Sequence, residues 1–200
     1  TRSPGVSELR GLLREHVQAG SLLFGAVGDV SKAHRRIKVR RQDWGFQACR
    51  MDPGKVWLNT VGTYGMASAA YWWARTAAAA LVRLAHYLLG PELLLEFLLY
   101  VDDFVVLART GHQVDAIALL IYTLACLGVR FSWRKFKGGT DFGWIGYYLD
   151  VRTYALGISQ SRAEWLTTWI DGRLEEGTVN LRDLAAVLGR LCFAMGPLEF

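Results

Sequence analysis

The strongest constraint on this chain is a pair of adjacent carboxylates set between two apolar runs. Asp102 and Asp103 follow Leu98-Leu99-Tyr100-Val101 and precede Phe104-Val105-Val106-Leu107. Two apolar runs of strand length joined by a polar pair are typical of a β-hairpin, here with both acids at its tip. Carboxylates so close together repel one another unless a cation neutralises them, and Mg²⁺ prefers such oxygen ligands. The segment therefore predicts either a magnesium site or a solvated acidic turn.

A third carboxylate favours the metal site. Asp29 ends the apolar run at residues 22–28, which has the length of a strand. If that strand lies beside the hairpin, Asp29, Asp102 and Asp103 converge. Three carboxylates around two Mg²⁺ ions, about 3.5–4 Å apart, form the phosphoryl-transfer site of polymerases and nucleases. We therefore expect these three acids to bind two Mg²⁺ ions, with Mn²⁺ as a substitute.

The order of the acids resembles the palm of reverse transcriptases. Tyr100-Val101-Asp102-Asp103 matches that family's Tyr-x-Asp-Asp signature, and Asp29, some seventy residues earlier, matches its first palm motif. The resemblance, of the retroelement type, implies an α+β fold: a ferredoxin-like palm whose mixed or antiparallel sheet carries packed helices, followed by helical thumb or connection elements. It assigns residues 1–20 to the end of the fingers or a leading helix, 21–150 to the palm and 151–200 to the thumb or connection.

The resemblance also implies roles around the incoming nucleotide. The backbone carbonyl of Val30 would assist metal binding, and Lys135 would lie near the pyrophosphate leaving group and protonate it. His34 stands where the family has a Tyr or Phe that excludes a 2′-hydroxyl, and Tyr64 and Gly65 match a motif that contacts the nucleotide. Two simpler interpretations stay open: His34 as a surface residue of a basic turn, and Tyr64-Gly65 as a plain strand-to-helix turn.

Contacts with nucleic acid are expected on both sides of the acids. A cluster of basic residues follows Asp29: Lys32, Arg35, Arg36, Lys38, Arg40 and Arg41. Such a run is either a solvated face or a phosphate-binding one, and beside a metal site we favour phosphate contacts for Arg35 and Arg36. By resemblance, Tyr100 and the primer-grip motif Trp144-Ile145-Gly146 would also touch nucleic acid. Ordinary strand packing is the alternative for Trp144.

Hydrophobic periodicity and turn residues predict the secondary structure. We expect helices at 6–19, at 67–89 with Gly90-Pro91 as the stop, at 117–127, from a capping box at Ser161 and Glu164, and from Asn180 to Met195. We expect strands at 22–28, 46–50, 56–61, 98–107 (the hairpin), 129–133 and 142–151, with a turn at 135–139.

Composition limits the remaining possibilities. The 200-residue chain is 52% hydrophobic and carries a net charge of +5, which excludes a disordered chain and suits an anionic partner weakly. The three cysteines are widely spaced in apolar surroundings, so we predict buried hydrophobes rather than disulfides or zinc ligands: Cys49, Cys126 and Cys192. No apolar stretch is long enough to cross a membrane, so an intracellular location follows only by default.

Two functions remain. The first is RNA-directed DNA synthesis on an RNA or DNA template, by two-metal phosphoryl transfer from a dNTP to the primer 3′-hydroxyl. The second is a catalytically inactive, reverse-transcriptase-like domain that binds nucleic acid through its sheet and basic face. A structural module of ferredoxin-like type is a third interpretation, but it leaves the order of the motifs unexplained.

Overall fold

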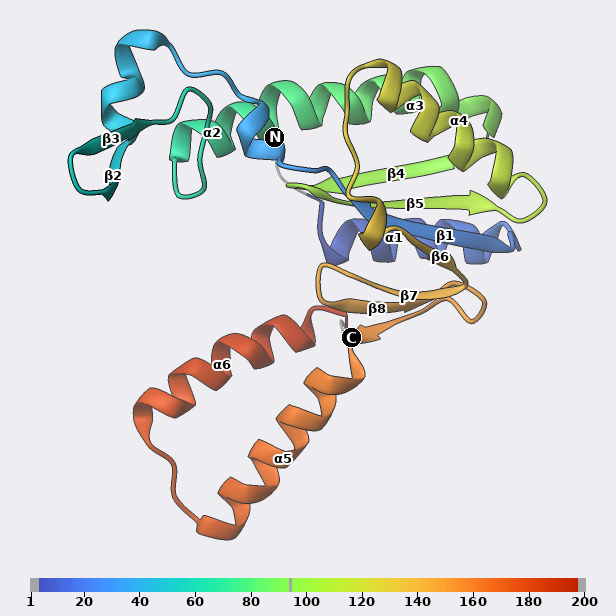
Figure 1. Cartoon of the computed structure of the whole chain (residues 1–200). Helices are drawn as coiled ribbons and strands as arrows, with labels where there is room; N and C mark the ends of the chain where they lie inside the picture. Colours follow the sequence, from blue (N-terminus) through green and yellow to red (C-terminus); the bar gives the residue numbers. More distant parts are fainter. Residues whose placement is uncertain (1–3, 94, 198–200) are drawn as a thin grey trace.

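The computed structural model describes residues 4–93 and 95–197. Its centre is a sheet of four strands in the spatial order β4-β5-β1-β6 (Figure 1). The strands are β1 (Leu23–Asp29), β4 (Leu95–Tyr100), β5 (Asp103–Arg109) and β6 (Lys137–Gly139). Each neighbouring pair is antiparallel. The expected α+β class with an antiparallel sheet and packed helices is therefore confirmed.

Strand β5 shows why the sheet is covered on both faces. Its central residues are all buried, and their side chains alternate between two hydrophobic cores. Phe104 and Val106 face the first core, together with helices α3 (Ala79–Leu93) and α4 (Gln113–Cys126). Val105 and Leu107 face the second core, together with helix α1 (Val6–Gln18). A continuous apolar run is the pattern expected of a strand buried on both faces.

The first core contains most of the large aromatic contacts. Phe104 is fully buried, and its ring lies 5.9 Å from the ring of Phe97, 5.7 Å from that of Phe131 and 5.9 Å from that of Phe136. Above it runs a long helix made of α2 (Ala67–Trp72), a π-helical segment η3 (Trp73–Ala78) and α3. The residue that follows Asp102 and Asp103 along the chain is thus fixed in the centre of this core.

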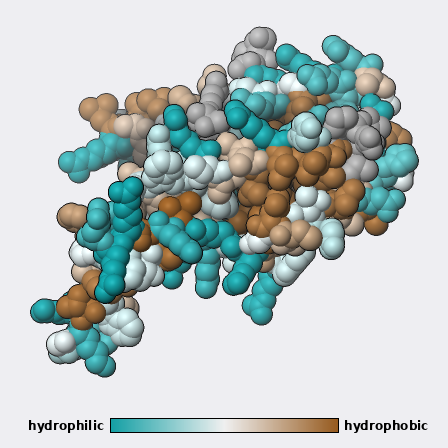
Figure 2. All heavy atoms as spheres, turned by 90° about the horizontal axis from the view of Figure 1, so that it is seen from above, coloured by the Kyte–Doolittle hydropathy of each residue, from teal (hydrophilic) through white to brown (hydrophobic). Residues whose placement is uncertain are grey.

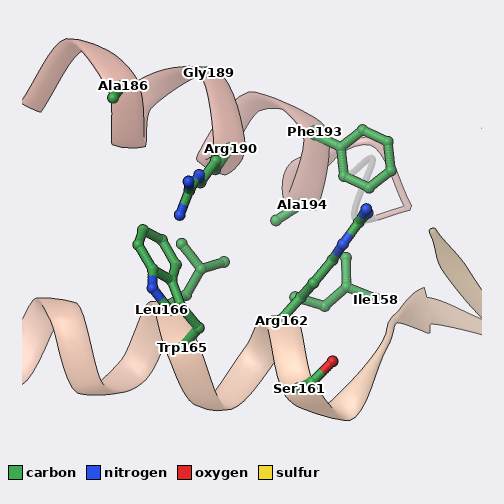
Figure 3. Close-up of a pocket in the computed structure, with 10 residues that line it drawn as sticks. All are labelled: Ile158, Ser161, Arg162, Trp165, Leu166, Ala186, Gly189, Arg190, Phe193 and Ala194. Atoms are coloured by element: carbon green, nitrogen blue, oxygen red, sulfur yellow. The ribbon is translucent and has the colours of Figure 1, made fainter. Parts of the chain in front are cut away.

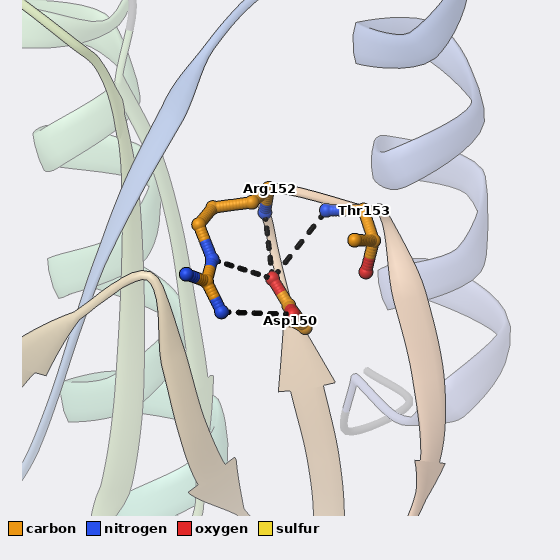
Figure 4. A network of polar contacts seen from close by, with 3 residues as sticks. All are labelled: Asp150, Arg152 and Thr153. Carbon is orange, nitrogen blue, oxygen red and sulfur yellow. Dashed lines mark hydrogen bonds and ion pairs between the residues drawn. The ribbon is translucent and has the colours of Figure 1, made fainter.

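A second sheet lies under the first and closes the other core. It has the order β7-β8-β9, with β7 (Asp141–Trp144), β8 (Tyr147–Asp150) and β9 (Ala155–Ile158). Asp150 tightens the turn between β8 and β9: it accepts hydrogen bonds from the backbone N–H groups of Arg152, at 2.9 Å, and Thr153, and from the Arg152 guanidinium (Figure 4). The Arg152 hydrogen bonds lower the pKa of Asp150, so the turn carries its own charge compensation.

Two further parts project from this centre. A separate hairpin, β2 (Ala48–Asp52) and β3 (Lys55–Leu58), follows the short 3₁₀ helices η1 (Ala33–Arg36) and η2 (Arg41–Gln47), and its strand residues are all exposed. At the other end, α5 (Gln160–Glu176) and α6 (Leu181–Met195) extend away from the sheets (Figure 1). The Asn180 side chain caps α6 as the sequence suggests, by accepting from the N–H of Arg182.

Several predicted boundaries are wrong. Residues 129–133 form no strand: Phe131 makes only an isolated bridge with Val30, and the 3₁₀ helix η4 (Trp133–Lys135) follows. Residues 142–151 are two strands, because Ile145 and Gly146 have positive φ angles of 44° and 89° and turn the chain back. Part of the expected 135–139 turn is strand β6, which pairs with β1.

Two helix boundaries also differ. Helix α3 continues through Gly90-Pro91 to Leu93, so this pair does not end the helix where the sequence predicts. Helix α5 begins one residue before the predicted capping box. Ser159 is its N-cap, and the side chain of Glu164 accepts from Gln160 rather than closing a box with Ser161.

The prediction of buried cysteines is wrong for all three. Cys49 lies on the exposed hairpin, Cys126 at the end of α4 and Cys192 on α6, and each is exposed. Apolar neighbours in sequence do not decide burial here: Leu124 is buried, whereas Cys126, two residues later on the same helix, is exposed. Figure 2, which looks onto the helical layer, shows such apolar side chains gathered over α3 and α4, where Tyr87, Leu88 and Val114 are exposed.

None of the described helices is long and apolar enough to span a membrane.

Candidate active site

The candidate site lies where β1 and β5 end side by side. Asp29 and Asp103 are direct cross-strand partners in this antiparallel pair. By the alternation of side chains, both share the face of Val27 and Val105, toward the second core. Like charges directly opposite one another destabilise a sheet. The predicted convergence of the acids on neighbouring strands is thus present, and it brings an electrostatic cost.

The hairpin turn differs by one residue from the prediction. Val101 and Asp102 form the turn, and Asp103 is the first residue of β5, paired with Tyr100. Val101 has a φ of 55°, a left-handed conformation that is a genuine outlier for a β-branched residue. Such strain costs of order 1–3 kcal/mol and persists only where surrounding contacts hold it. Asp102 is tied to the neighbouring strand: its carbonyl accepts the N–H of Val30 at 2.7 Å.

The carboxylate of Asp29 is buried, and each of its oxygens has a partner. Lys135 Nζ donates to Oδ2 at 2.8 Å, and Ser132 Oγ donates to Oδ1 at 2.6 Å. Asp29 is 5% exposed, whereas the Lys135 side chain is 65% exposed. Both partners come from the short helix η4 and the residue before it. Ser132 is not among the residues predicted from the sequence, although its position three residues before Lys135 places both on one side of a 3₁₀ turn.

These contacts shift two pKa values in the directions expected for a cluster of acids. Burial raises the pKa of Asp103, and the negative charges of Asp102 and Asp29 raise it further, against a lowering effect of Lys135. The hydrogen bond to Asp29, and the charge of that carboxylate, raise the pKa of Lys135. Lys135 therefore stays a cation and neutralises part of the acidic cluster.

The set of donor atoms has the chemistry that Mg²⁺ prefers, since three carboxylates and the Val30 carbonyl offer hard oxygen ligands. Its present arrangement does not suit the ion. Within residues 4–93 and 95–197, no three His, Cys, Asp or Glu side chains are placed to hold a metal ion together. Lys135 bonds one Asp29 oxygen and Ser132 the other. Metal binding would require Lys135 to release Oδ2.

Two of the candidate nucleotide-binding residues lie together near the start of the long helix. The rings of His34 and Tyr64 are 5.4 Å apart, and Tyr64 is 72% exposed. The His34 Nδ1 atom is buried without a hydrogen-bond partner. Gly65 has a φ of 82°, a left-handed conformation that favours glycine. The structure therefore brings together an exposed aromatic ring and an imidazole with a free polar atom.

The two candidate arginines after Asp29 differ. Arg36 Nε donates to the Ser31 carbonyl at 3.3 Å, and its Nη1 donates to the Gly128 carbonyl at 3.1 Å. Burial lowers the Arg36 pKa, and the neighbouring Arg130 lowers it further. Arg36 thus has a structural role that the sequence did not indicate, whereas Arg35 is exposed and available for a phosphate.

The primer-grip candidates have clear structural roles. Trp144 is 3% exposed in the second core, so the expected contact between its side chain and a primer has no surface in this conformation. Gly146 lets the Arg162 guanidinium approach: a Cβ at this position would lie 2.1 Å from Arg162 Nη1, which donates to the Gly146 carbonyl. Tyr100, at the end of β4, is 41% exposed and can contact a ligand beside the acids.

A separate cleft lies between α5 and α6, with a volume of about 560 Å³. Figure 3 shows two arginines that reach into it, one from each helix. The Arg162 guanidinium lies 4.7 Å from the centre of the Phe193 ring, and that of Arg190 lies 4.1 Å from the centre of the Trp165 ring. These cation–π contacts hold the two helices together.

No protein-family model and no curated protein sequence matches this chain. Solved structures do resemble it. A foamy viral protease–reverse transcriptase, solved with an RNA/DNA hybrid, superposes with a TM-score of 0.61 at 16% identity and covers 86% of this chain. The telomerase of Candida tropicalis superposes with a TM-score of 0.58 at 9% identity and covers 79%. The telomerase of Candida albicans, solved with a fragment of telomeric RNA, superposes with a TM-score of 0.53 at 11% identity and covers 78%.

The chain has a reverse-transcriptase-like fold. It spans 21% of the foamy viral chain and 40% and 33% of the two telomerase chains. At these identities the likeness establishes the arrangement of strands and helices. The roles of individual residues rest on the geometry of the site.

The raised pKa of Asp103 predicts a pH-dependent stability. A folded-state pKa above the ordinary value of 3.8 means that stability is lost as the pH rises through the folded-state pKa. We expect Asp103→Asn to be more stable than the parent chain at pH 7, by about 0.2–1 kcal/mol for a like-charge cross-strand pair. The gain should vanish as the pH falls below about 3.8. Urea unfolding in EDTA at several pH values measures it, with the exposed Asp52→Asn as control; a gain that is the same at every pH would contradict the prediction.

The contact between Lys135 and Asp29 predicts that the lysine and a metal ion compete for the Asp29 carboxylate. Lys135→Gln should lower the stability of the metal-free chain by roughly 1 kcal/mol, a value between those of exposed and buried ion pairs. The variant should then gain more than the parent from millimolar Mg²⁺, because the cation competing for Asp29 is gone. Thermal unfolding with and without Mg²⁺ tests this, with Lys137→Gln, an exposed lysine of β6, as the matched control. Equal Mg²⁺ effects in all three proteins would contradict it.

Proposed function

We propose that this chain contains the catalytic palm of an RNA-directed DNA polymerase of the retroelement type. The reaction is template-directed transfer of a nucleotide from a dNTP to the 3′-hydroxyl of a primer, on an RNA or DNA template. Residues 21–150 would form the palm, residues 1–20 the leading helix or end of the fingers, and α5 and α6 the start of the thumb or connection. Supporting the proposal, the structural neighbours include a reverse transcriptase solved with an RNA/DNA hybrid.

One observation carries the proposal: the direct pairing of Asp29 with Asp103 across β1 and β5, next to the Val101-Asp102 turn. A sheet gains nothing from two opposed carboxylates at the end of a ladder. A site for a divalent cation does need them, because it takes its ligands from closely spaced acids. The electrostatic cost of placing Asp29 opposite Asp103 therefore favours a cation-binding site over a purely structural turn.

The residues of the chain would divide the chemistry as follows. Asp29, Asp102, Asp103 and the Val30 carbonyl would hold two Mg²⁺ ions, which supply activation of the primer hydroxyl and neutralisation of the charge that develops on the phosphate. Lys135, once released from Asp29, would donate a proton to the pyrophosphate leaving group. Its raised pKa keeps it protonated in the metal-free chain.

The surrounding residues would position the substrates. His34 and Tyr64 would contact the sugar and base of the incoming nucleotide, with Gly65 allowing its close approach. Arg35 would bind a phosphate of the template or primer, and Tyr100 would lie beside the primer end. Arg36, Trp144 and Gly146 would act indirectly, since their contacts lie within the protein.

The second candidate is an inactive domain that keeps the fold and binds nucleic acid. The contact between Lys135 and Asp29 is the observation that favours it, since an ammonium group already neutralises the buried acid. The two candidates differ in what Asp102 contributes. An inactive domain has no need of this carboxylate in the turn, whereas a polymerase loses its activity without it.

Primer extension tests the choice directly. On an RNA template with dNTPs and Mg²⁺, we expect the chain to extend a primer, and Asp102→Asn to reduce the rate by at least 10³-fold, about 4 kcal/mol of transition-state stabilisation. Asp115→Asn, at the start of α4, serves as the control for loss of one acid. Duplex binding without any extension, together with no gain in thermal stability from Mg²⁺, would favour the inactive domain instead.

The identity of His34 predicts weak discrimination against ribonucleotides. An imidazole is smaller than a Phe ring, so it leaves more room beside C2′, and it can hydrogen-bond a 2′-hydroxyl rather than exclude it. We expect His34→Phe to raise the preference for deoxynucleotides by about 1–3 kcal/mol, or 5- to 150-fold in the ratio of kcat/KM values. Single-nucleotide insertion with matched dNTP and rNTP measures the ratio, and an unchanged ratio would show that His34 is not at the sugar.

A further inference from the structure

A buried tryptophan lies directly under the acidic turn. Trp73 is the first residue of the π-helical segment and is 2% exposed. Its indole Nε1 donates a hydrogen bond to the carbonyl of Val101, at 2.6 Å, across 28 residues of sequence. Val101 is the strained residue that immediately precedes Asp102. The long helix is thus joined to the turn at a residue with a strained backbone conformation.

We propose that Trp73 is a positioning residue, whose indole N–H holds Val101 in its left-handed conformation and so fixes where Asp102 and Asp103 lie. A β-branched residue does not adopt a φ of 55° by preference. Two contacts hold the turn on opposite sides. Trp73 binds the Val101 carbonyl from the helix, and Val30 binds the next carbonyl, that of Asp102, from β1. The strand pairing of Tyr100 with Asp103 closes the turn but leaves the Val101 peptide without another hydrogen bond among those described, so the indole N–H is the contact that acts on Val101 itself.

The π-helical segment explains how the indole reaches the turn. The N–H of Ala79 donates to the carbonyl of Ala74, five residues back, as a π-helix requires. In such a wide turn, residues five apart lie on nearly the same side, so both Trp73 and Ala78 are buried in the first core. The hydroxyl of Thr76 compensates locally by donating to the Trp72 carbonyl. π-helical turns are rare and occur most often at functional sites.

The first core gives the indole a fixed position. Trp73 belongs to the same cluster of buried residues as Val30 and Ala33, and Val101 packs against that cluster. The ring is therefore held by packing, and its N–H points to one acceptor. A group held in this way can fix a neighbouring backbone more strictly than a flexible polar side chain can.

Hydrogen exchange of the Val30 amide tests the positioning directly, because this amide donates to Asp102. In Trp73→Phe, we expect the Val30 amide to exchange about tenfold faster, as the turn samples other conformations. The Ser132 amide, which donates to the Asp29 carbonyl on the other side of the site, should keep its rate. The ¹³C chemical shifts of Val101 should move away from those of a left-handed residue.

Two variants separate the hydrogen bond from other effects. Trp44→Phe is the matched control, since Trp44 also donates its indole N–H to a backbone carbonyl, that of Val39 at 3.0 Å, away from the turn. It should leave the Val30 amide unchanged. β-(3-Benzothienyl)alanine in place of Trp73 keeps the size of the ring and lacks the N–H. It should therefore raise the exchange rate of the Val30 amide, and it tests the hydrogen bond separately from packing if Trp73→Phe folds poorly.

The outcomes are decisive in both directions. Faster exchange confined to Val30 in both Trp73 variants supports the proposal. Exchange that is unchanged at Val30, or that rises equally at Val30 and Ser132, overturns it, because the first means no positioning and the second means general destabilisation. The catalytic consequence alone rests on the proposed polymerase function. A parent chain without polymerase activity would refute that function and leave the exchange result to decide the role of Trp73.

In an active chain, a kinetic readout adds a second test. Trp73→Phe should lower kcat for primer extension about tenfold and leave KM for the nucleotide within about twofold, since the acids move and the nucleotide contacts do not. Trp44→Phe should change neither. A rise in KM with kcat unchanged would contradict the assignment, because it would place the effect in nucleotide binding.

Discussion

The opposition of Asp29 and Asp103 across β1 and β5 is the constraint on which the rest of the site depends. Carboxylates on directly paired residues of neighbouring strands disfavour one another's ionisation unless a cation or hydrogen-bond donor compensates. Lys135 and Ser132 supply part of this compensation by binding Asp29, while burial, together with the charges of Asp102 and Asp29, raises the pKa of Asp103. The sheet can hold this arrangement because both of its faces are buried, which fixes the ends of the strands.

The site is built from four separate stretches of the chain that the fold brings to one end of the sheet. Strand β1 contributes Asp29, the β4–β5 hairpin contributes Asp102 and Asp103, the short helix η4 contributes Lys135, and the π-helical segment contributes Trp73. Each stretch depends on the others: the turn needs the indole and Val30, and Asp29 needs the lysine. Such mutual dependence is typical of a preorganised site.

The sequence predicts that Asp29 and the acids of the hairpin lie on neighbouring strands, because apolar runs ending in carboxylates indicate both the strands and their shared edge. The sequence predicts less well the features that depend on contacts between residues far apart in the chain. The one-residue shift of the turn follows from the pairing of Tyr100 with Asp103, and the contact of Ser132 with Asp29 follows from an isolated bridge and a 3₁₀ turn. The exposure of Cys126 could not be predicted either, since helix α4 is apolar on its outer side as well.

We propose that the three acids form a site for divalent cations and that Lys135 neutralises Asp29 until a metal ion binds. A crystal structure of the chain soaked with Mn²⁺ tests it most directly, because anomalous scattering locates the ion independently of any activity. We expect anomalous peaks among Asp29, Asp102 and Asp103, with Lys135 Nζ no longer bonded to Asp29 Oδ2. The absence of any peak there, with Lys135 still on Asp29 at millimolar Mn²⁺, would contradict it.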